Sequence, residues 1–237
     1  MWTCNSTYKY SIHFSESKAI NDNLEISMRT LFNFYFNEKC IESDEYTRDS
    51  LTEIANFTNG LAMQKFRPKE NEKGIPVLKI KELGQGFCDS SSDICSPTIK
   101  SDYLINDGDV IFSWSGTLLV DIWCGGKCGL NQHLFKVTSN NYPLWFAYLW
   151  TIKHLDGFIR ISKDKAVTMG HIKRIDLEKA EVFTPNNDIL HKLDKIFTPI
   201  FNSYISVKVE SRKLGKIRDC ILPKLMLGEL KINDLNS

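Results

Sequence analysis

The C-terminal part of the chain has the clearest periodic pattern of apolar positions. Over residues 190–225, apolar side chains recur at gaps that alternate between three and four, broken only at Ser211 and Arg218. This spacing predicts a long helix with a coiled-coil seam. Pro199 and Pro223 lack a backbone donor, so we expect the helix to kink at both.

A second amphipathic helix is predicted near the N-terminus, at residues 17–38. Its apolar pattern matches that of the C-terminal helix at an offset of 190 residues, which indicates one type of helix used twice or two unrelated helices of the same period. The side chains expected in the dimer or coiled-coil interface are Leu24, Leu31, Tyr35, Leu193, Phe197, Ile200, Tyr204, Val207, Leu214, Ile221 and Leu225.

The middle of the chain alternates short β-rich runs with turn residues. Strands are predicted at residues 77–80, 110–114, 118–123 and 133–137, and a helix at residues 142–155. The fold class is therefore α+β, with one globular domain of mixed or antiparallel sheet flanked by long helices. The expected organisation is an N-terminal arm and helix (1–48), the globular domain (49–185) and the C-terminal helix (186–237).

Composition excludes several classes of protein. The chain has 237 residues, 42% of them hydrophobic, which is too apolar for a disordered protein. No apolar run approaches the roughly 20 residues of a membrane helix. Residues 1–17 are polar and lack a signal-peptide core, so we expect a cytoplasmic protein that does not contact membranes.

The net charge of +1 conceals an uneven distribution. Residues 65–81 hold six basic and two acidic residues, and residues 153–174 hold the same numbers. Between them, residues 82–126 hold seven acidic residues and one basic residue. The two basic stretches predict a patch that binds a phosphate backbone, unless they are ordinary solvated loops.

Motifs for catalysis are absent from the sequence. There is no P-loop, GxGxxG, GxSxG or HExxH pattern. Cys88 and Cys95, followed by Cys124 and Cys128, suggest a four-thiolate zinc site, but six residues separate the first pair, and zinc knuckles are tighter. Free thiols are the favoured interpretation, so we expect no metal, no cofactor and a binding or scaffold function.

Several strings in order resemble the target recognition domain of type I restriction-modification specificity subunits. They are residues 59–69 (NGLAMQKFRPK), 75–83 (IPVLKIKEL), 108–116 (GDVIFSWSG), 130–137 (LNQHLFKV) and 168–174 (TMGHIKR). Residues 218–230 (RDCILPKLMLGEL) resemble the C-terminal conserved helix of this family, and residues 21–32 resemble its central conserved helix. The resemblance covers nearly the whole chain from about residue 10.

The resemblance implies a DNA-reading subunit without catalysis of its own. Family members carry two recognition domains, held apart by two helices that pair as an antiparallel coiled coil, and each domain reads half of a split site. The resemblance also implies partners: double-stranded DNA, methyltransferase subunits and restriction/translocase subunits. With one recognition domain, the chain resembles a half-length subunit that forms a homodimer or pairs with another half. A coiled-coil protein-interaction adaptor and an inactive silent cassette stay open as alternatives.

Candidate DNA-contacting residues follow from charge and side-chain chemistry. The cations expected on phosphates are Lys65, Arg67, Lys69, Lys79, Lys81, Lys163, Lys165, Lys173 and Arg174. The residues expected at base edges are Gln64, Ser113, Trp114, Ser115, Asn131, Gln132, His133 and, with less support, His171. For Trp114 we favour a packing role, because Trp is usually largely buried.

Overall fold

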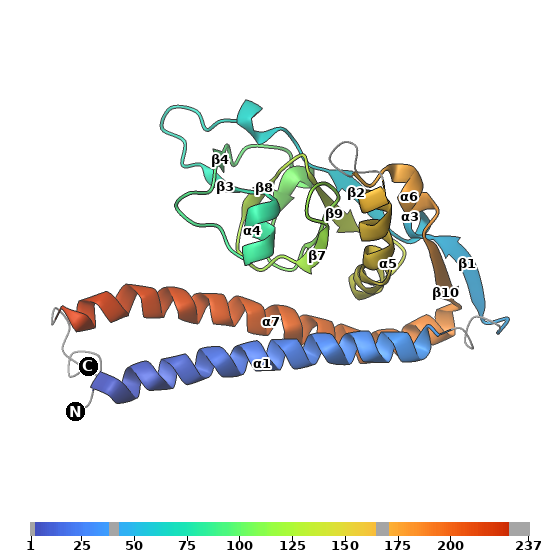
Figure 1. The fold of residues 1–237 in the computed structure, drawn as a ribbon, viewed down its shortest axis with the longest axis horizontal. Helices are drawn as coiled ribbons and strands as arrows, with labels where there is room; N and C mark the ends of the chain where they lie inside the picture. The colour runs from blue at the N-terminus through green and yellow to red at the C-terminus, as the bar shows by residue number, and fades with distance from the viewer. Residues whose placement is uncertain (1–2, 38–42, 165–170, 228–237) are drawn as a thin grey trace.

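Two long helices lie side by side along one edge of the molecule, and a mixed α/β domain lies against them (Figure 1). The computed structural model describes residues 3–37, 43–164 and 171–227. Helices α1 (Thr3–Tyr35) and α7 (Asn187–Met226) run antiparallel, with the start of α1 and the end of α7 at the same end of the pair. The predicted fold class, an α+β domain flanked by helices that form an antiparallel coiled coil, is confirmed.

The first long helix differs in extent from the prediction. Helix α1 begins at Thr3 rather than near residue 17. Helix α7 contains Pro199 and Pro223, as predicted, and the kinks expected at them stay a prediction. Within the described ranges, no helix combines the length and the apolar character needed to cross a membrane.

The remaining elements build the mixed domain and its connection to the helices. The helices are α3 (Leu51–Ile54), α4 (Ile80–Gln85), α5 (Leu144–Asp164) and α6 (Arg174–Glu178), with the 3-10 turns η1 (Met63–Lys65) and η2 (Ser101–Tyr103). The strands are β1 (Tyr46–Ser50), β2 (Asn56–Asn59), β3 (Ile75–Leu78), β4 (Ile94–Cys95), β5 (Leu104–Ile105), β6 (Val110–Ser113), β7 (Leu119–Ile122), β8 (Cys128–Leu130), β9 (Leu134–Thr138) and β10 (Glu181–Pro185). The four predicted strands correspond to β3, β6, β7 and β9, and the predicted middle helix corresponds to α5.

The strands form three sheets. The antiparallel pair β1–β10 joins the helices to the mixed domain, with Tyr46 opposite Pro185 and Ser50 opposite Glu181. One four-stranded sheet, β2-β9-β6-β7, is antiparallel. The other, β4-β3-β8-β5, contains the parallel pair β3–β8. The sheet content is therefore mixed, as expected.

Helix α5 is the centre of the main hydrophobic core. Trp145 stacks on Phe197 of α7 with ring centroids 4.3 Å apart, and its indole N–H donates to Asp194 Oδ1 at 2.8 Å. Trp150 packs edge-on against Phe32 of α1 at 5.2 Å. Large aromatic surfaces contribute strongly to core stability, so α5 fixes both long helices to the domain.

The predicted seam is filled within a single chain. Leu193, Phe197 and Tyr204 are buried, partly by α5, and Leu24, Leu31, Tyr35, Ile200, Val207 and Ile221 are half-buried. Leu214 is 38% exposed, and the side chain of Leu225 lies outside the described residues. The buried positions thus contact elements of the same chain, and an interface with a second chain stays a prediction.

Candidate nucleic-acid interface

Four stretches that the sequence motifs singled out meet on one surface of the mixed domain. Leu61, after β2, forms a bridge with Asn131, after β8. Ser115, after β6, forms a bridge with His171, which precedes α6. Figure 1 shows β2 and α6 on the side of the domain that faces away from α1 and α7. The motifs are thus far apart in sequence but form one surface cluster.

Trp114 is half-buried at the centre of this cluster. Its indole N–H donates to Asn59 Oδ1 at 3.1 Å. Its ring stacks on Phe135 at 5.6 Å and lies 6.1 Å from the ring of His133 and 5.5 Å from that of His171. Trp114 therefore holds the segments together, which supports the packing role that we favoured for it.

Asn131, Gln132 and His133 form a turn whose polar groups bond to one another. The buried Asn131 accepts a hydrogen bond at Oδ1 from the backbone N–H of His133 at 3.3 Å. Gln132 Nε2 lies 3.3 Å from His133 Nε2. The other imidazole nitrogen, His133 Nδ1, is buried without a hydrogen-bond partner among the described residues. Gln132 and His133 thus lie as a linked, half-buried pair at the edge of the cluster.

The two serines of the GDVIFSWSG string are not placed to reach a base. Ser113 is fully buried, and its hydroxyl donates to the carbonyl oxygen of Thr117 at 2.7 Å. Ser115 is 3% exposed. The chain turns at Gly116, between Ser115 and Thr117, where the backbone φ is positive at 67°. We correct the assignment of both serines to base edges, because their side chains are inside the domain.

Exposed cations follow the first stretch of the cluster along the chain. The exposed residues of η1 and the loop after it include Gln64, Lys65, Arg67 and Lys69. Within the described ranges, none of these three cations forms a direct ion pair, although Arg67 and Lys69 are near enough to Asp93 and Glu72 to help lower the pKa of those carboxyls. Their charged groups are exposed and can contact phosphate.

A second group of cations follows the cluster toward α6. Lys163 and Lys173 are exposed and make no ion pair with any described residue. Arg174 lies 3.7 Å from Glu178, but its side chain is 80% exposed. Lys165 lies outside the described residues.

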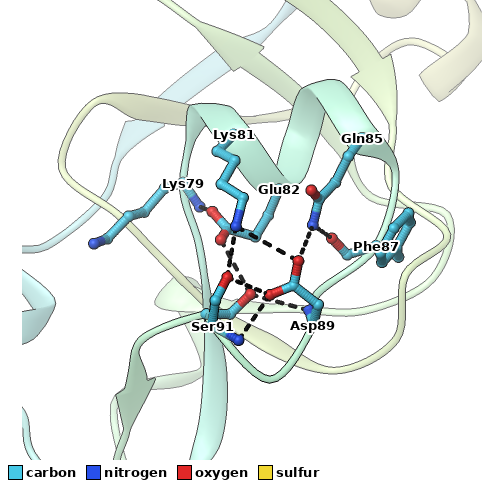
Figure 2. A network of polar contacts seen from close by, with 8 residues as sticks. Lys79, Lys81, Glu82, Gln85, Phe87, Asp89 and Ser91 are labelled. Atoms are coloured by element: carbon cyan, nitrogen blue, oxygen red, sulfur yellow. Dashed lines mark hydrogen bonds and ion pairs between the residues drawn. The ribbon is translucent and has the colours of Figure 1, made fainter.

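Lys79 and Lys81, in contrast, are engaged by acidic groups of the same loop. The Lys79 amine lies 2.6 Å from Asp93. The Lys81 amine lies 2.7 Å from the Ser91 hydroxyl and 3.5 Å from Asp89 (Figure 2). Hydrogen bonds from the Ser91 hydroxyl and backbone lower the pKa of Asp89 to about 2, so this carboxylate stays charged. Both lysines are partly neutralised and are weaker phosphate candidates than the sequence predicted.

Two acidic residues of the stretch 82–126, Asp107 and Asp121, form ion pairs with α7. Arg212 forms a bidentate ion pair with Asp107, with Nη1 2.6 Å from Oδ1 and Nη2 2.8 Å from Oδ2. Its Nη1 also donates to the Cys124 carbonyl oxygen. Lys208 binds both carboxylate oxygens of Asp121 at 2.9 and 3.0 Å. The opposite charges of the two segments were visible in the sequence, but their pairing was not.

The four middle cysteines do not converge. In the described part of the chain, no three His, Cys, Asp or Glu side chains lie together as a metal site would require. Cys88 contacts Cys128, whereas Cys124 packs in a different core cluster. Burial raises the pKa of Cys95 and of Cys124 to about 11, so these thiols stay neutral and pack as small apolar groups.

Comparison with known families decides the assignment of the chain. The model of the type I restriction modification DNA specificity domain matches residues 43–215, from the start of the mixed domain into α7. The chain belongs to this family. The family resemblance carried by the sequence motifs is therefore confirmed.

Related specificity subunits are longer than this chain. It is 29% identical to the type I restriction enzyme MjaIX specificity subunit of Methanocaldococcus jannaschii, over 92% of this chain and 55% of that protein. It is 24% identical to the EcoBI specificity subunit of Escherichia coli, over 81% of this chain and 40% of that protein. The chain thus spans about half the length of the curated relatives it matches.

A solved specificity subunit shares the fold. The crystal structure of the S subunit from M. genitalium superposes with a TM-score of 0.58 at 15% identity, over 93% of this chain and 59% of that one. At this identity the comparison supports the architecture of specificity subunits, a mixed domain carried by long paired helices, and nothing finer.

Proposed function

We propose that the chain reads one half of a bipartite target in double-stranded DNA, as a non-catalytic specificity subunit of a type I restriction-modification complex. The observation that carries the proposal is the cluster around Trp114, where four distant stretches meet and carry exposed cations. Membership in a family described by DNA specificity supports it.

The chemistry of this surface suits a duplex. Lys65, Arg67, Lys69 and Lys173 supply charge for phosphates, which fixes position but carries no sequence information. Gln132 and Gln64 carry amides, which can pair with adenine in the major groove. Because the stretches are held by strand pairing and by Trp114, these groups are presented on a rigid scaffold.

The paired helices are the proposed docking region for methyltransferase and restriction subunits. We propose that a second recognition domain, from another copy or from a different specificity chain, completes the bipartite site. Since the seam between α1 and α7 is filled within the chain, such pairing would use the outer faces of the helices. Exposed apolar residues are available there, including Ile26 and Phe34 on α1 and Ile217 on α7.

The test is co-expression of the full chain with its cognate methyltransferase subunit, followed by mapping of methylated bases in genomic DNA. We expect methylation at one bipartite motif, absent when the methyltransferase subunit is expressed alone. The triple variant Lys65→Ala, Arg67→Ala, Lys69→Ala should reduce methylation at that motif, whereas Lys100→Ala should not, because this exposed lysine lies outside both the candidate interface and the paired helices.

Two outcomes contradict the proposal. One is methylation that needs this chain but follows no bipartite motif. The other is duplex binding by the full chain that does not weaken with salt, which would support the adaptor alternative, because phosphate contacts always carry a salt dependence.

A further inference from the structure

The loop that follows η1 is fixed to the body of the mixed domain at its start. Met63 is 2% exposed and packs with Val77 and Cys95 in a small core cluster. The backbone N–H of Phe66 donates to the Met63 carbonyl oxygen at 3.0 Å, and the Phe66 carbonyl oxygen accepts from the backbone N–H of Ser96 at 2.8 Å. The backbone on both sides of Phe66 is thereby held in place.

The far end of the same loop is fixed as well. The Glu72 carboxylate accepts hydrogen bonds from the backbone N–H of Lys69 at 2.9 Å and from the Ser96 hydroxyl at 3.0 Å. At Gly74, a β-carbon would lie 2.0 Å from Ile94 Cγ2 and 2.7 Å from a Pro68 carbon. The end of the loop is therefore in close contact with strand β4. A loop held this way can carry a side chain at a defined position.

The side chains of this loop alternate between cation and apolar group. Phe66 is 37% exposed although its backbone is anchored, and it lies between Lys65 and Arg67, with Lys69 beyond Pro68. A single exposed Phe is unremarkable on a protein surface. An aromatic side chain on an anchored backbone between two exposed cations is different, because the cations bring a phosphate backbone to the ring.

We propose that Phe66 is a wedge residue whose ring stacks against a base step of the bound duplex. This inference rests on the proposed DNA-reading function and adds a residue that acts on the shape of the target. Lys65 and Arg67 hold the phosphates on either side, and the ring occupies the space opened between neighbouring base pairs. Since flexible steps open most easily, Phe66 contributes to target choice through DNA deformability.

The test uses the full chain in complex with the cognate methyltransferase subunit and a duplex that contains the mapped target. 2-Aminopurine replaces one base at a time along the half-site, and its fluorescence rises where stacking is lost. We expect a rise at one step with the natural chain, no rise with Phe66→Ala, and recovery with Phe66→Trp. Phe66→Ala should also weaken binding by about 10-fold or more, without changing the salt dependence.

Phe87→Ala is the matched control. Phe87 is 50% exposed, but it lies beside Gln85, whose amide donates to the Phe87 carbonyl oxygen, and its neighbours in sequence are not cations (Figure 2). This variant should retain the fluorescence rise and the affinity. Equal thermal unfolding of the Phe66→Ala and natural chains ensures that the comparison concerns DNA and not folding.

The outcomes separate this inference from the proposed function. Tight, salt-dependent binding without a fluorescence rise at any step, or an equal rise with Phe66→Ala, overturns the wedge and leaves the reading function intact. If the complex does not bind the duplex, both the function and the wedge are rejected.

Discussion

Gly60 lies at the end of β2, where the chain enters the loop that carries the free cations. A β-carbon there would lie 2.2 Å from the carbonyl oxygen of Asn131 and 2.5 Å from that of Leu130. The backbone N–H of Gly60 also donates to the Leu134 carbonyl oxygen at 3.0 Å. The two motif stretches approach closely only because this position has no side chain.

Substitution of this glycine should disturb both stability and recognition. Gly60→Ala forces backbone against backbone, so we expect a loss of about 1–3 kcal/mol in the free energy of unfolding, measured with urea. Gly84→Ala in α4 is the control, because the nearest atom to its β-carbon is 3.9 Å away. It should stabilise the chain by about 0.5–1 kcal/mol. Equal effects of the two changes would contradict the close approach at Gly60.

The sequence identified the types of residue in the candidate site better than their environments. Exposed Lys65, Arg67 and Lys69 agree with the prediction of a basic stretch. Ser113 and Lys79 do not fit their predicted roles, because burial and ion pairing depend on segments distant in the chain. No local pattern indicates that Ser113 turns inward or that Lys79 meets Asp93.

The docking of the mixed domain on α7 is a property of whole elements. Helix α7 brings Arg212 and Lys208 against the loops around Asp107 and Asp121. Burial alone would raise the pKa of Asp107, but hydrogen bonds from Arg212 and from the Gly126 N–H lower it overall. The ion pair is thus part of what orients the domain on its helix.

Removal of Arg212 should weaken this docking in a pH-dependent way. Arg212→Ala is expected to lower the free energy of unfolding by about 1–2 kcal/mol at pH 7, whereas Lys216→Ala on the same helix should change it little. A carboxyl with a lowered folded pKa stabilises above its unfolded pKa and loses that effect in acid. The difference between the natural chain and Arg212→Ala should therefore shrink below about pH 4. A difference that persists unchanged in acid would contradict the role of the charged pair.

At the level of elements, the periodic pattern of apolar residues predicts where most of the helices and strands lie. The seam in α7 and the strands β6, β7 and β9 lie where the pattern of apolar residues placed them. The extension of α1 to Thr3 was missed, because residues 3–16 lack a regular apolar stripe. The parallel pairing of β3 with β8 was also missed, since it joins residues some fifty positions apart and depends on tertiary packing.

For the whole molecule, the net charge of +1 is the sum of separated surfaces. The acidic stretch is partly neutralised by α7, and Lys79 and Lys81 are engaged within their own loop. Exposed cations without an ion pair among the described residues, such as Lys65 and Lys173, lie on the stretches that build the Trp114 cluster, and others, such as Lys192 and Lys216, lie along α7. A near-neutral chain can therefore present a locally basic face to a polyanion.

This distribution predicts which lysines determine the salt dependence of DNA binding. Replacing Lys65, Arg67 and Lys69 together with Ala should reduce the slope of log K against log salt by up to about 2.7, because each lost phosphate contact removes about 0.9. Replacing Lys79 and Lys81 should change the slope by less than about 1. Titration of a fluorescent duplex at several salt concentrations measures both. A larger effect from the second pair would show that the ion pairs of Lys79 with Asp93 and of Lys81 with Asp89 do not restrain these amines.

The antiparallel arrangement of α1 and α7 also determines how the molecule would respond to mechanical force. The start of α1 and the end of α7 lie at the same end of the helix pair (Figure 1). Force applied between them therefore breaks the contacts of the seam one after another, starting from that end. Helix α7 is anchored to the mixed domain by Arg212 and Lys208, and the C-terminal part of α1 is anchored by Phe32 against Trp150, so the N-terminal part of α1 detaches first. Tension reaches the sheets last, through β1, and the cluster around Trp114 keeps its shape until the helix pair has come apart.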